Sequence, residues 1–187
     1  MKQVRSFDLF SIILHWSSAI LIFILFPLGL YMVELSYYDS WYKGSTELHK
    51  SLGLCFILLL VVRVLWRIRV SRLVSCEFKK DKNWESNLAY VVQMLMYISM
   101  ILLAVSGYMV STAGGREVMF FEWLPLPPLW MEFEQQEEFA GKAHLYMSWL
   151  LIGLICLHFL SAIKHHFIDR DEVLIRILKP VTIKRGK

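Results

Sequence analysis

Charged residues are scarce in this chain. Asp, Glu, Lys and Arg make up 19% of its 187 residues, against roughly 25% in ordinary soluble domains. Hydrophobic residues make up 57%, and the mean hydropathy of the chain is positive at +0.50. This balance excludes an ordinary soluble domain, so we interpret 1–187 as a single membrane domain.

Cysteine is also rare, and its spacing carries no metal motif. Cys55, Cys76 and Cys156 form no CxxC pair, and two of them lie inside apolar runs. We therefore interpret them as small apolar residues rather than as a disulfide or a metal site. The chain has no HExxH motif, no cysteine-rich cluster, no internal repeat and no low-complexity segment. These absences exclude the common zinc motifs and the solenoid folds.

Long apolar runs are abundant, and four of them are long enough to cross the hydrocarbon core of a bilayer. The predicted transmembrane helices cover about 10–33, 48–68, 87–110 and 143–163. The first run is longer than the core of a signal peptide, and we expect it to stay in the protein. The predicted fold is all-α, a transmembrane four-helix bundle.

Lysine and arginine are distributed unevenly between the two ends of this bundle. The segments 1–9, 69–86 and 164–187 hold fourteen of them, whereas the loops 34–48 and 112–142 hold three. Because basic residues concentrate on the cytoplasmic side, we expect both termini to be cytoplasmic. In a bacterium this orientation predicts the inner membrane. The loop 112–142 also carries six acidic residues, so the outer face is expected to be negative.

The fourth predicted helix carries two histidines and no charged residue. His144 and His158 lie fourteen residues apart, which on a helix returns to nearly the same face after a rise of about 21 Å. One helix would therefore present an imidazole near each membrane surface.

The other two intramembrane histidines match these two depths. His15 lies near the inner end of the first helix, level with His158, and His49 lies at the outer end of the second, level with His144. Two imidazoles from facing helices at one level are what the iron of a bis-histidine b-type haem requires. We therefore predict that His15 and His158 bind the iron of an inner haem and that His49 and His144 bind that of an outer one. Without a CxxCH motif, both haems would be non-covalent.

Two other interpretations of these histidines remain open. A single polar residue in a membrane helix often hydrogen-bonds to a neighbouring helix. A zinc or copper site would need three or four ligands at one place, whereas each level supplies two. His165 and His166 follow the fourth helix in a polar context, and we interpret them as interfacial.

Two basic residues lie where haem propionates would need partners. Arg63 follows His49 by fourteen residues, so it lies on nearly the same face at the inner level. A guanidinium suits a carboxylate in bidentate geometry, and we predict that Arg63 binds an inner propionate. Lys50 is the corresponding prediction at the outer level. We interpret Arg67 as a positive anchor at the inner interface. No catalytic residue and no nucleic-acid partner are predicted.

These features resemble the bacterial cytochrome b561 family of four-helix, dihaem membrane proteins. The resemblance covers about Phe7 to Pro180 and is carried by His15-Trp16, His49 with Ser51 and Gly53, Arg63 with Arg67, Ser106-Gly107, and His144, His158, His165 and His166. The stretches LSYYDSWYKGSTELHKSLG, SGYMVSTAGG and HHFIDRDEVL look most like the YceJ-type branch.

The resemblance implies two b-type haems and single-electron transfer between the periplasmic side and the membrane quinone pool. At least one relative oxidises superoxide and reduces ubiquinone, and the YceJ-type branch is linked to a small periplasmic isoprenoid-binding partner. The acidic loop 112–142 departs from this pattern, because a negative outer face repels superoxide. Two alternative functions are the membrane anchor of a multi-subunit redox enzyme and a haem-free proton or metal transporter.

Overall fold

A computed structural model describes residues 8–74, 84–129, 132–170 and 173–178. Its four long helices are α1 (Leu9–Glu34), α2 (Tyr42–Val74), α3 (Trp84–Ser111) and α4 (Gln136–Phe167). The shorter elements are the 3-10 turn η1 (Ala113–Gly115), the strands β1 (Val118–Phe120) and β2 (Leu124–Leu126), and the helix α5 (Val173–Leu178).

The four expected helices are confirmed, but two of them are longer than their uncharged cores. α2 begins at Tyr42, inside the predicted loop 34–48, and continues past Arg67. α4 begins at Gln136, so its first two turns lie inside the predicted loop 112–142. Polar residues extend both helices beyond the bilayer core, where water satisfies their side chains. Hydropathy marks only the part of a helix that must lie in hydrocarbon.

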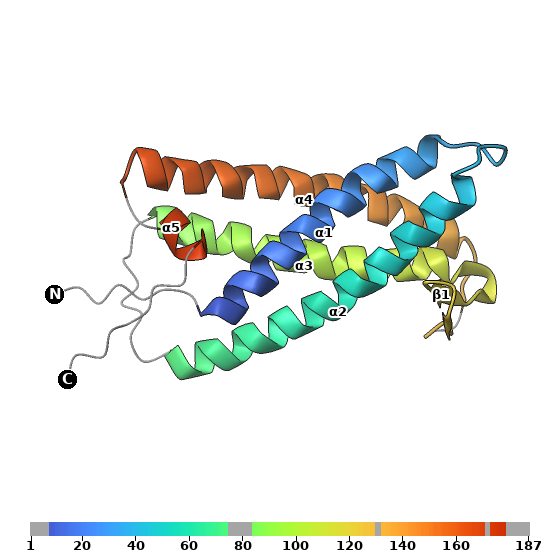
Figure 1. Ribbon diagram of the computed structural model, residues 1–187, viewed down its shortest axis with the longest axis horizontal. Coiled ribbons are helices and arrows are strands. Elements are labelled where there is room, and N and C mark those ends of the chain that lie inside the picture. The colour runs from blue at the N-terminus through green and yellow to red at the C-terminus, as the bar shows by residue number, and fades with distance from the viewer. Residues whose placement is uncertain (1–7, 75–83, 130–131, 171–172, 179–187) are drawn as a thin grey trace.

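The long helices run up and down along one axis, so their connections alternate between two ends (Figure 1). One end holds the connection from α1 to α2, the strands and the start of α4, and is called the hairpin end below. The other end holds the starts of α1 and α3 and the small helix α5, and is called the α5 end. Much of the basic sequence behind the predicted orientation, in 1–7, 75–83 and 179–187, lies outside the described residues.

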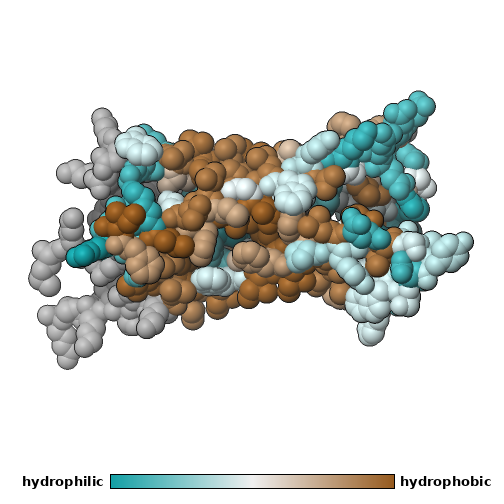
Figure 2. Space-filling model, turned by 90° about the horizontal axis from the view of Figure 1, so that it is seen from above, coloured by the Kyte–Doolittle hydropathy of each residue, from teal (hydrophilic) through white to brown (hydrophobic). Residues whose placement is uncertain are grey.

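An apolar belt surrounds the middle of the bundle. Figure 2 shows this belt in brown on the face in view, with hydrophilic side chains gathered toward the two ends of the bundle. Each long helix contains an 18-residue window apolar enough to cross a membrane, and only 11% to 17% of each window is buried inside the protein. Such an extent of exposed apolar surface needs lipid to cover it, as in a multi-pass membrane protein.

The core holds the four helices together through a small apolar cluster and several serines. Ile22, Phe56, Leu60, Met100 and Leu151 form the cluster, with at least one residue from each long helix. The buried serines include Ser18, Ser51, Ser99 and Ser106. A serine in a helix can donate its hydroxyl hydrogen to a backbone carbonyl of the preceding turn, as Ser18 Oγ does to the Leu14 carbonyl at 2.6 Å. Small side chains at these positions let the helices approach closely.

A two-stranded hairpin follows α3, and the sequence analysis did not predict it. β1 and β2 pair antiparallel, with Val118 opposite Leu126. The hairpin is tied to α2 because the Phe121 amide donates a 2.9 Å hydrogen bond to the buried Ser51 hydroxyl. The all-α prediction therefore holds for the four long helices. It is corrected in the segment after α3, where two short strands form a hairpin. Pro125 inside β2 is tolerated because a two-stranded hairpin consists only of edge strands.

Candidate functional site: two histidine pairs

The four intramembrane histidines meet in two pairs. The ring centroids of His15 on α1 and His158 on α4 lie 6.5 Å apart. Those of His49 on α2 and His144 on α4 lie 6.3 Å apart. These are the same two pairs that the depth argument grouped. One pair lies toward the α5 end and the other toward the hairpin end, joined by α4.

These separations fit a metal ion between the two rings of each pair. A metal–nitrogen bond of about 2.0 Å and about 1.1 Å from nitrogen to ring centroid put two opposed imidazoles roughly 6.2 Å apart. Two imidazoles in direct hydrogen-bonded contact would stand closer together. The observed 6.3 Å and 6.5 Å therefore leave room for one metal ion between the two rings of each pair, and the two histidines of that pair would hold it.

The His49–His144 pair is called the outer pair and the His15–His158 pair the inner pair, after the sides that the sequence predicts for them. In the outer pair, the tautomer of one ring is fixed. His144 Nδ1 lies 3.1 Å from the Leu103 carbonyl oxygen and 3.3 Å from the Ser106 hydroxyl, both on α3. Because a carbonyl only accepts, His144 Nδ1 must carry the proton and donate it. The other ring nitrogen, Nε2, then keeps a free lone pair, which is the state in which histidine binds a metal.

Two glycines press against the outer pair from neighbouring helices. A Cβ on Gly107 would lie 2.9 Å from His144 Cε1, and one on Gly29 would lie 3.1 Å from His49 Cε1. His49 Nδ1 is buried and makes no hydrogen bond to any described residue. Gly107 is among the residues that carry the family resemblance, whereas Gly29 was missed because glycine is common in membrane helices.

The inner pair is bordered by an arginine. Arg63 Nη2 lies 3.1 Å from His15 Nδ1, and its guanidinium lies 5.5 Å from the Tyr97 ring centroid. Arg67 covers the same ring at 5.0 Å and donates a 2.9 Å hydrogen bond to Gln93. Stacking on one tyrosine keeps two positive charges beside the inner site. The structure thus places Arg63 at the histidine pair and Arg67 toward the α5 end.

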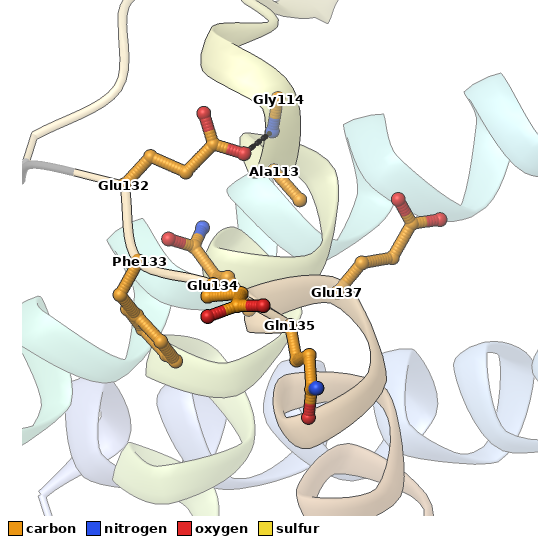
Figure 3. A pocket seen from close by; sticks show the side chains of 8 residues that line it. Ala113, Gly114, Glu132, Phe133, Glu134, Gln135 and Glu137 are labelled. Atoms are coloured by element: carbon orange, nitrogen blue, oxygen red, sulfur yellow. Dashed lines mark hydrogen bonds between the residues drawn. The ribbon is translucent and has the colours of Figure 1, made fainter.

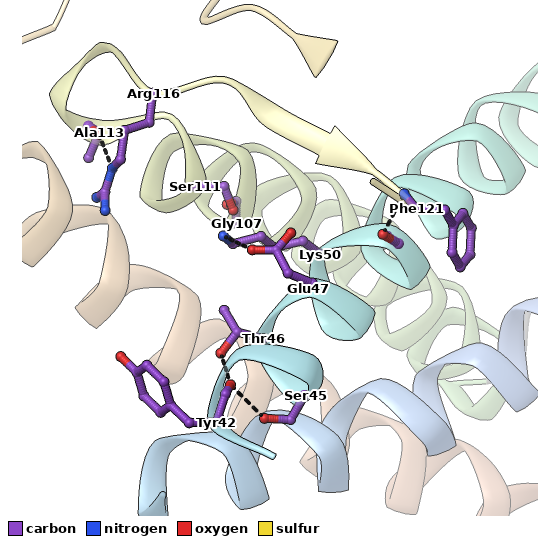
Figure 4. A network of polar contacts seen from close by, with 11 residues as sticks. Tyr42, Ser45, Thr46, Glu47, Lys50, Gly107, Ser111, Ala113, Arg116 and Phe121 are labelled. Atoms are coloured by element: carbon purple, nitrogen blue, oxygen red, sulfur yellow. Dashed lines mark hydrogen bonds and ion pairs between the residues drawn. The ribbon is translucent and has the colours of Figure 1, made fainter. Parts of the chain in front are cut away.

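Lys50 lies one residue from His49 but already has a carboxylate partner. Its Nζ is 3.1 Å from Glu47 Oε1, one turn earlier on α2, and both side chains are about three-quarters buried. Figure 4 shows this pair among the polar contacts of the hairpin end. A haem propionate at Lys50 would have to compete with Glu47, so its predicted role stays a prediction.

His165 and His166 lie at the end of α4, away from both pairs. His165 Nδ1 is 2.9 Å from Asp169 Oδ2, and Lys164 bridges Asp169 to Glu85 on α3 at 3.1 Å and 2.7 Å. Glu85, His165 and Asp169 are close enough to hold a metal ion. The Lys164 ammonium, however, already neutralises both carboxylates, so we interpret this group as an ion-pair clamp between α3 and α4.

A four-helix membrane bundle with a histidine pair toward each end has the architecture of a membrane cytochrome. The comparison with known proteins agrees with this class. The chain matches the family model of prokaryotic cytochrome b561 over residues 6–180 and belongs to that family. It is therefore a multi-pass, b-type membrane cytochrome of electron transport.

Three curated relatives match most of the chain. Cytochrome b561 homolog 2 of Escherichia coli is 38% identical over 164 residues, covering 88% of this chain and 86% of the relative. Cytochrome b561 homolog 1 of the same organism is 24% identical, covering 94% and 98%. A probable superoxide oxidase, CybB of Yersinia pestis, is 26% identical, covering 80% of each.

Proposed function

We propose that this chain binds two non-covalent b-type haems and passes single electrons between the outer face of a bacterial inner membrane and the quinone pool. The inner haem is held by His15 and His158, and the outer one by His49 and His144. The observation that carries the proposal is the presence of two imidazole pairs with ligand spacing toward opposite ends of one bundle. The α5 end then faces the cytoplasm.

The side chains of this chain do the positioning. A bound b-type haem supplies a one-electron carrier, because its iron alternates between the ferric and ferrous states. The Leu103 carbonyl holds the His144 proton on Nδ1 and leaves the lone pair of Nε2 free, so Nε2 would be the atom that binds the iron. The apolar cluster around Phe56 and Met100 excludes water from the bundle centre. α4 supplies one ligand to each pair and links the two ends of the path.

Access from the membrane is supported by an apolar cavity beside the outer pair. The cavity measures about 230 Å³ and lies between α3 and α4, where Ser106, Met109, Ala143 and Met147 are among its lining residues. Ser106 also contacts His144, so a molecule in this cavity would lie one side chain away from a proposed ligand. Its lining is almost entirely apolar, which suits the ring and first isoprene unit of a quinone.

The proposed outer donor is neutral or cationic rather than superoxide. Of the basic residues at the hairpin end that could attract an anion, Lys43 is one, and the other three each have a glutamate partner. Lys50 pairs with Glu47, Arg116 with Glu137 at 2.8 Å, and Lys142 with Glu138 at 2.5 Å. With these cations neutralised, the remaining glutamates of the outer loop set a negative field that repels superoxide.

One visible spectrum with a pyridine haemochrome titration tests the proposal. We expect reduced-minus-oxidised bands of haem b and a haem-to-chain ratio that approaches two. A colourless preparation would contradict the proposal and favour the haem-free proton or metal transporter. A stoichiometric iron–sulfur protein that co-purifies in mild detergent would instead make the chain the anchor of a larger redox enzyme.

Arg63→Gln is expected to lower the midpoint potential of the inner haem. Arginine only donates hydrogen bonds, so its contact requires His15 Nδ1 to accept, and the ring proton then lies on Nε2. If Nε2 is to bind the iron, that proton must move to Nδ1, and Arg63 must release the ring. The released guanidinium would then pair with a haem propionate, and its positive charge beside the haem would favour the ferrous state. Its removal is expected to lower the potential by roughly 30–60 mV, on the order of 1 kcal/mol.

A redox titration followed at the haem bands measures this shift. Arg67→Gln is the matched control, because it removes the same charge from the same tyrosine face without touching His15. Equal shifts in the two variants would show a general field effect and contradict the assignment of Arg63 to the propionate.

A further inference from the structure

A cavity at the hairpin end lies apart from both histidine pairs. It measures about 380 Å³ and lies between the turn after α3 and the start of α4 (Figure 3). Glu132, Glu134 and Glu137 line it, and its lining includes no Lys, Arg or His. The electron-transfer proposal uses these residues only for the charge of the outer face and gives none of them a ligand to hold. The cavity therefore needs an account of its own.

Gln136 supplies a buried acceptor at this cavity. Its side chain is 2% exposed, and its Nε2 donates a 2.8 Å hydrogen bond to the Met109 carbonyl. That bond fixes the orientation of the amide, because only the NH₂ group can donate to a carbonyl. The amide oxygen, Oε1, is buried and makes no hydrogen bond to any described residue. A buried acceptor left in this state is costly, so it indicates a missing donor or cation.

The surrounding charges favour a cation. Glu132 accepts a 2.6 Å hydrogen bond from the Gly114 amide, which orients its carboxylate at the cavity, and Figure 3 shows this contact. No ion pair involves Glu132 or Glu134 within the described ranges, whereas Glu137 is paired with Arg116. The start of α4 adds roughly half a positive charge. Two full negative charges outweigh it.

We propose that this cavity binds a hard divalent cation of the Ca²⁺ type, with Gln136 Oε1 and the carboxylates of Glu132 and Glu134 as protein ligands. All three donors are oxygens, which is the ligand set that Ca²⁺ prefers. Water completes the coordination on the side of the cavity away from the buried Gln136 oxygen. Such a hydrated site binds with a dissociation constant on the order of 10⁻⁴–10⁻³ M. The bound cation bridges the loop before α4 to the helix itself.

Calorimetric titration of the full-length holoprotein in detergent with CaCl₂ tests this site. The wild type is expected to bind one equivalent. E132Q/E134Q is expected to bind about tenfold more weakly or not at all, because two of the three ligands lose their charge. E117Q/E122Q is the matched control, since it changes the charge of the same loop equally without altering the lining of the cavity. Equal affinities in the two double variants would overturn the proposal.

Gln136 is tested by two further variants. Gln136→Met removes the amide oxygen and should abolish Ca²⁺ binding, whereas Gln136→Glu keeps an oxygen there and should retain binding. An unchanged haem spectrum and unfolding temperature show that each variant is folded. Calcium binding by Q136M at wild-type affinity would overturn the proposal. So would a wild-type protein that binds spermidine but not Ca²⁺, because the site would then take an organic ammonium.

Discussion

Alanine in place of His144 is expected to halve the haem content of the purified protein. His144 and His49 have the centroid separation of two axial ligands, and the described part of the bundle offers no third imidazole at that level. Without His144, the outer iron would have one protein ligand left, and the haem would be lost during purification. The inner pair lies about 21 Å away along α4, so its haem should stay.

The pyridine haemochrome titration gives this result as a haem-to-chain ratio that falls from about two to about one, as expected for two bis-histidine sites. His158→Ala should give the same ratio, with loss of the other haem and a different remaining potential. The double variant H144A/H158A should be colourless. His166→Ala is the control on the same helix and should keep both haems. A single variant at His144 or His158 that lost both haems, or neither, would contradict the assignment of one pair to each haem.

The histidine pairs could be predicted from the sequence because topology converts position along the chain into depth. Four apolar runs alternate in direction, so the start of one helix is level with the end of the next. His15 and His158 are thereby level, although 143 residues separate them in the chain. The fourteen-residue spacing of His144 and His158 then sets two levels rather than one. Nothing beyond hydropathy and helical geometry was needed.

The supporting contacts could not be predicted in the same way. The Leu103 carbonyl that holds His144 is a backbone group, and no residue type at position 103 signals it. Gly29 meets His49 through the rotation of α1 against α2, which hydropathy does not determine. The hairpin after α3 rests on pairing between two three-residue strands, too short for a periodic pattern. Each of these depends on packing between segments rather than on any one segment.

The ends of α2 and α4 show a related limit. Both helices extend past the uncharged runs into polar sequence, and α4 begins seven residues before the predicted span. This extension places Gln136 at the first turn of α4, against the Met109 carbonyl. The sequence predicted a loop at this position, and a glutamine in an exposed loop is not expected to be buried. The cation cavity was therefore outside the reach of the sequence analysis.

Gly107→Ala is expected to cost the protein its outer haem while sparing the inner one. Alanine is ordinarily favourable in a helix, so any loss must come from the space that the methyl group takes. The new Cβ would lie 2.9 Å from His144 Cε1 and 3.2 Å from Nδ1. The ring cannot turn away without breaking its 3.1 Å hydrogen bond to Leu103. Overpacking of this kind costs about 1–3 kcal/mol, which weakens haem binding by roughly ten- to a hundredfold.

The chain supplies graded controls for this substitution. A Cβ on Gly29 would meet His49 at 3.1 Å, and His49 Nδ1 has no hydrogen bond to lose, so Gly29→Ala should weaken the outer haem less. A Cβ on Gly153 meets nothing within 4 Å, so Gly153→Ala should leave both haems in place. Haem titration into the apoprotein, followed at the Soret band, ranks the three variants. Equal outer-haem affinity in G107A and G153A would show that His144 moves freely, and the outer site would then lack the rigid support assigned to it.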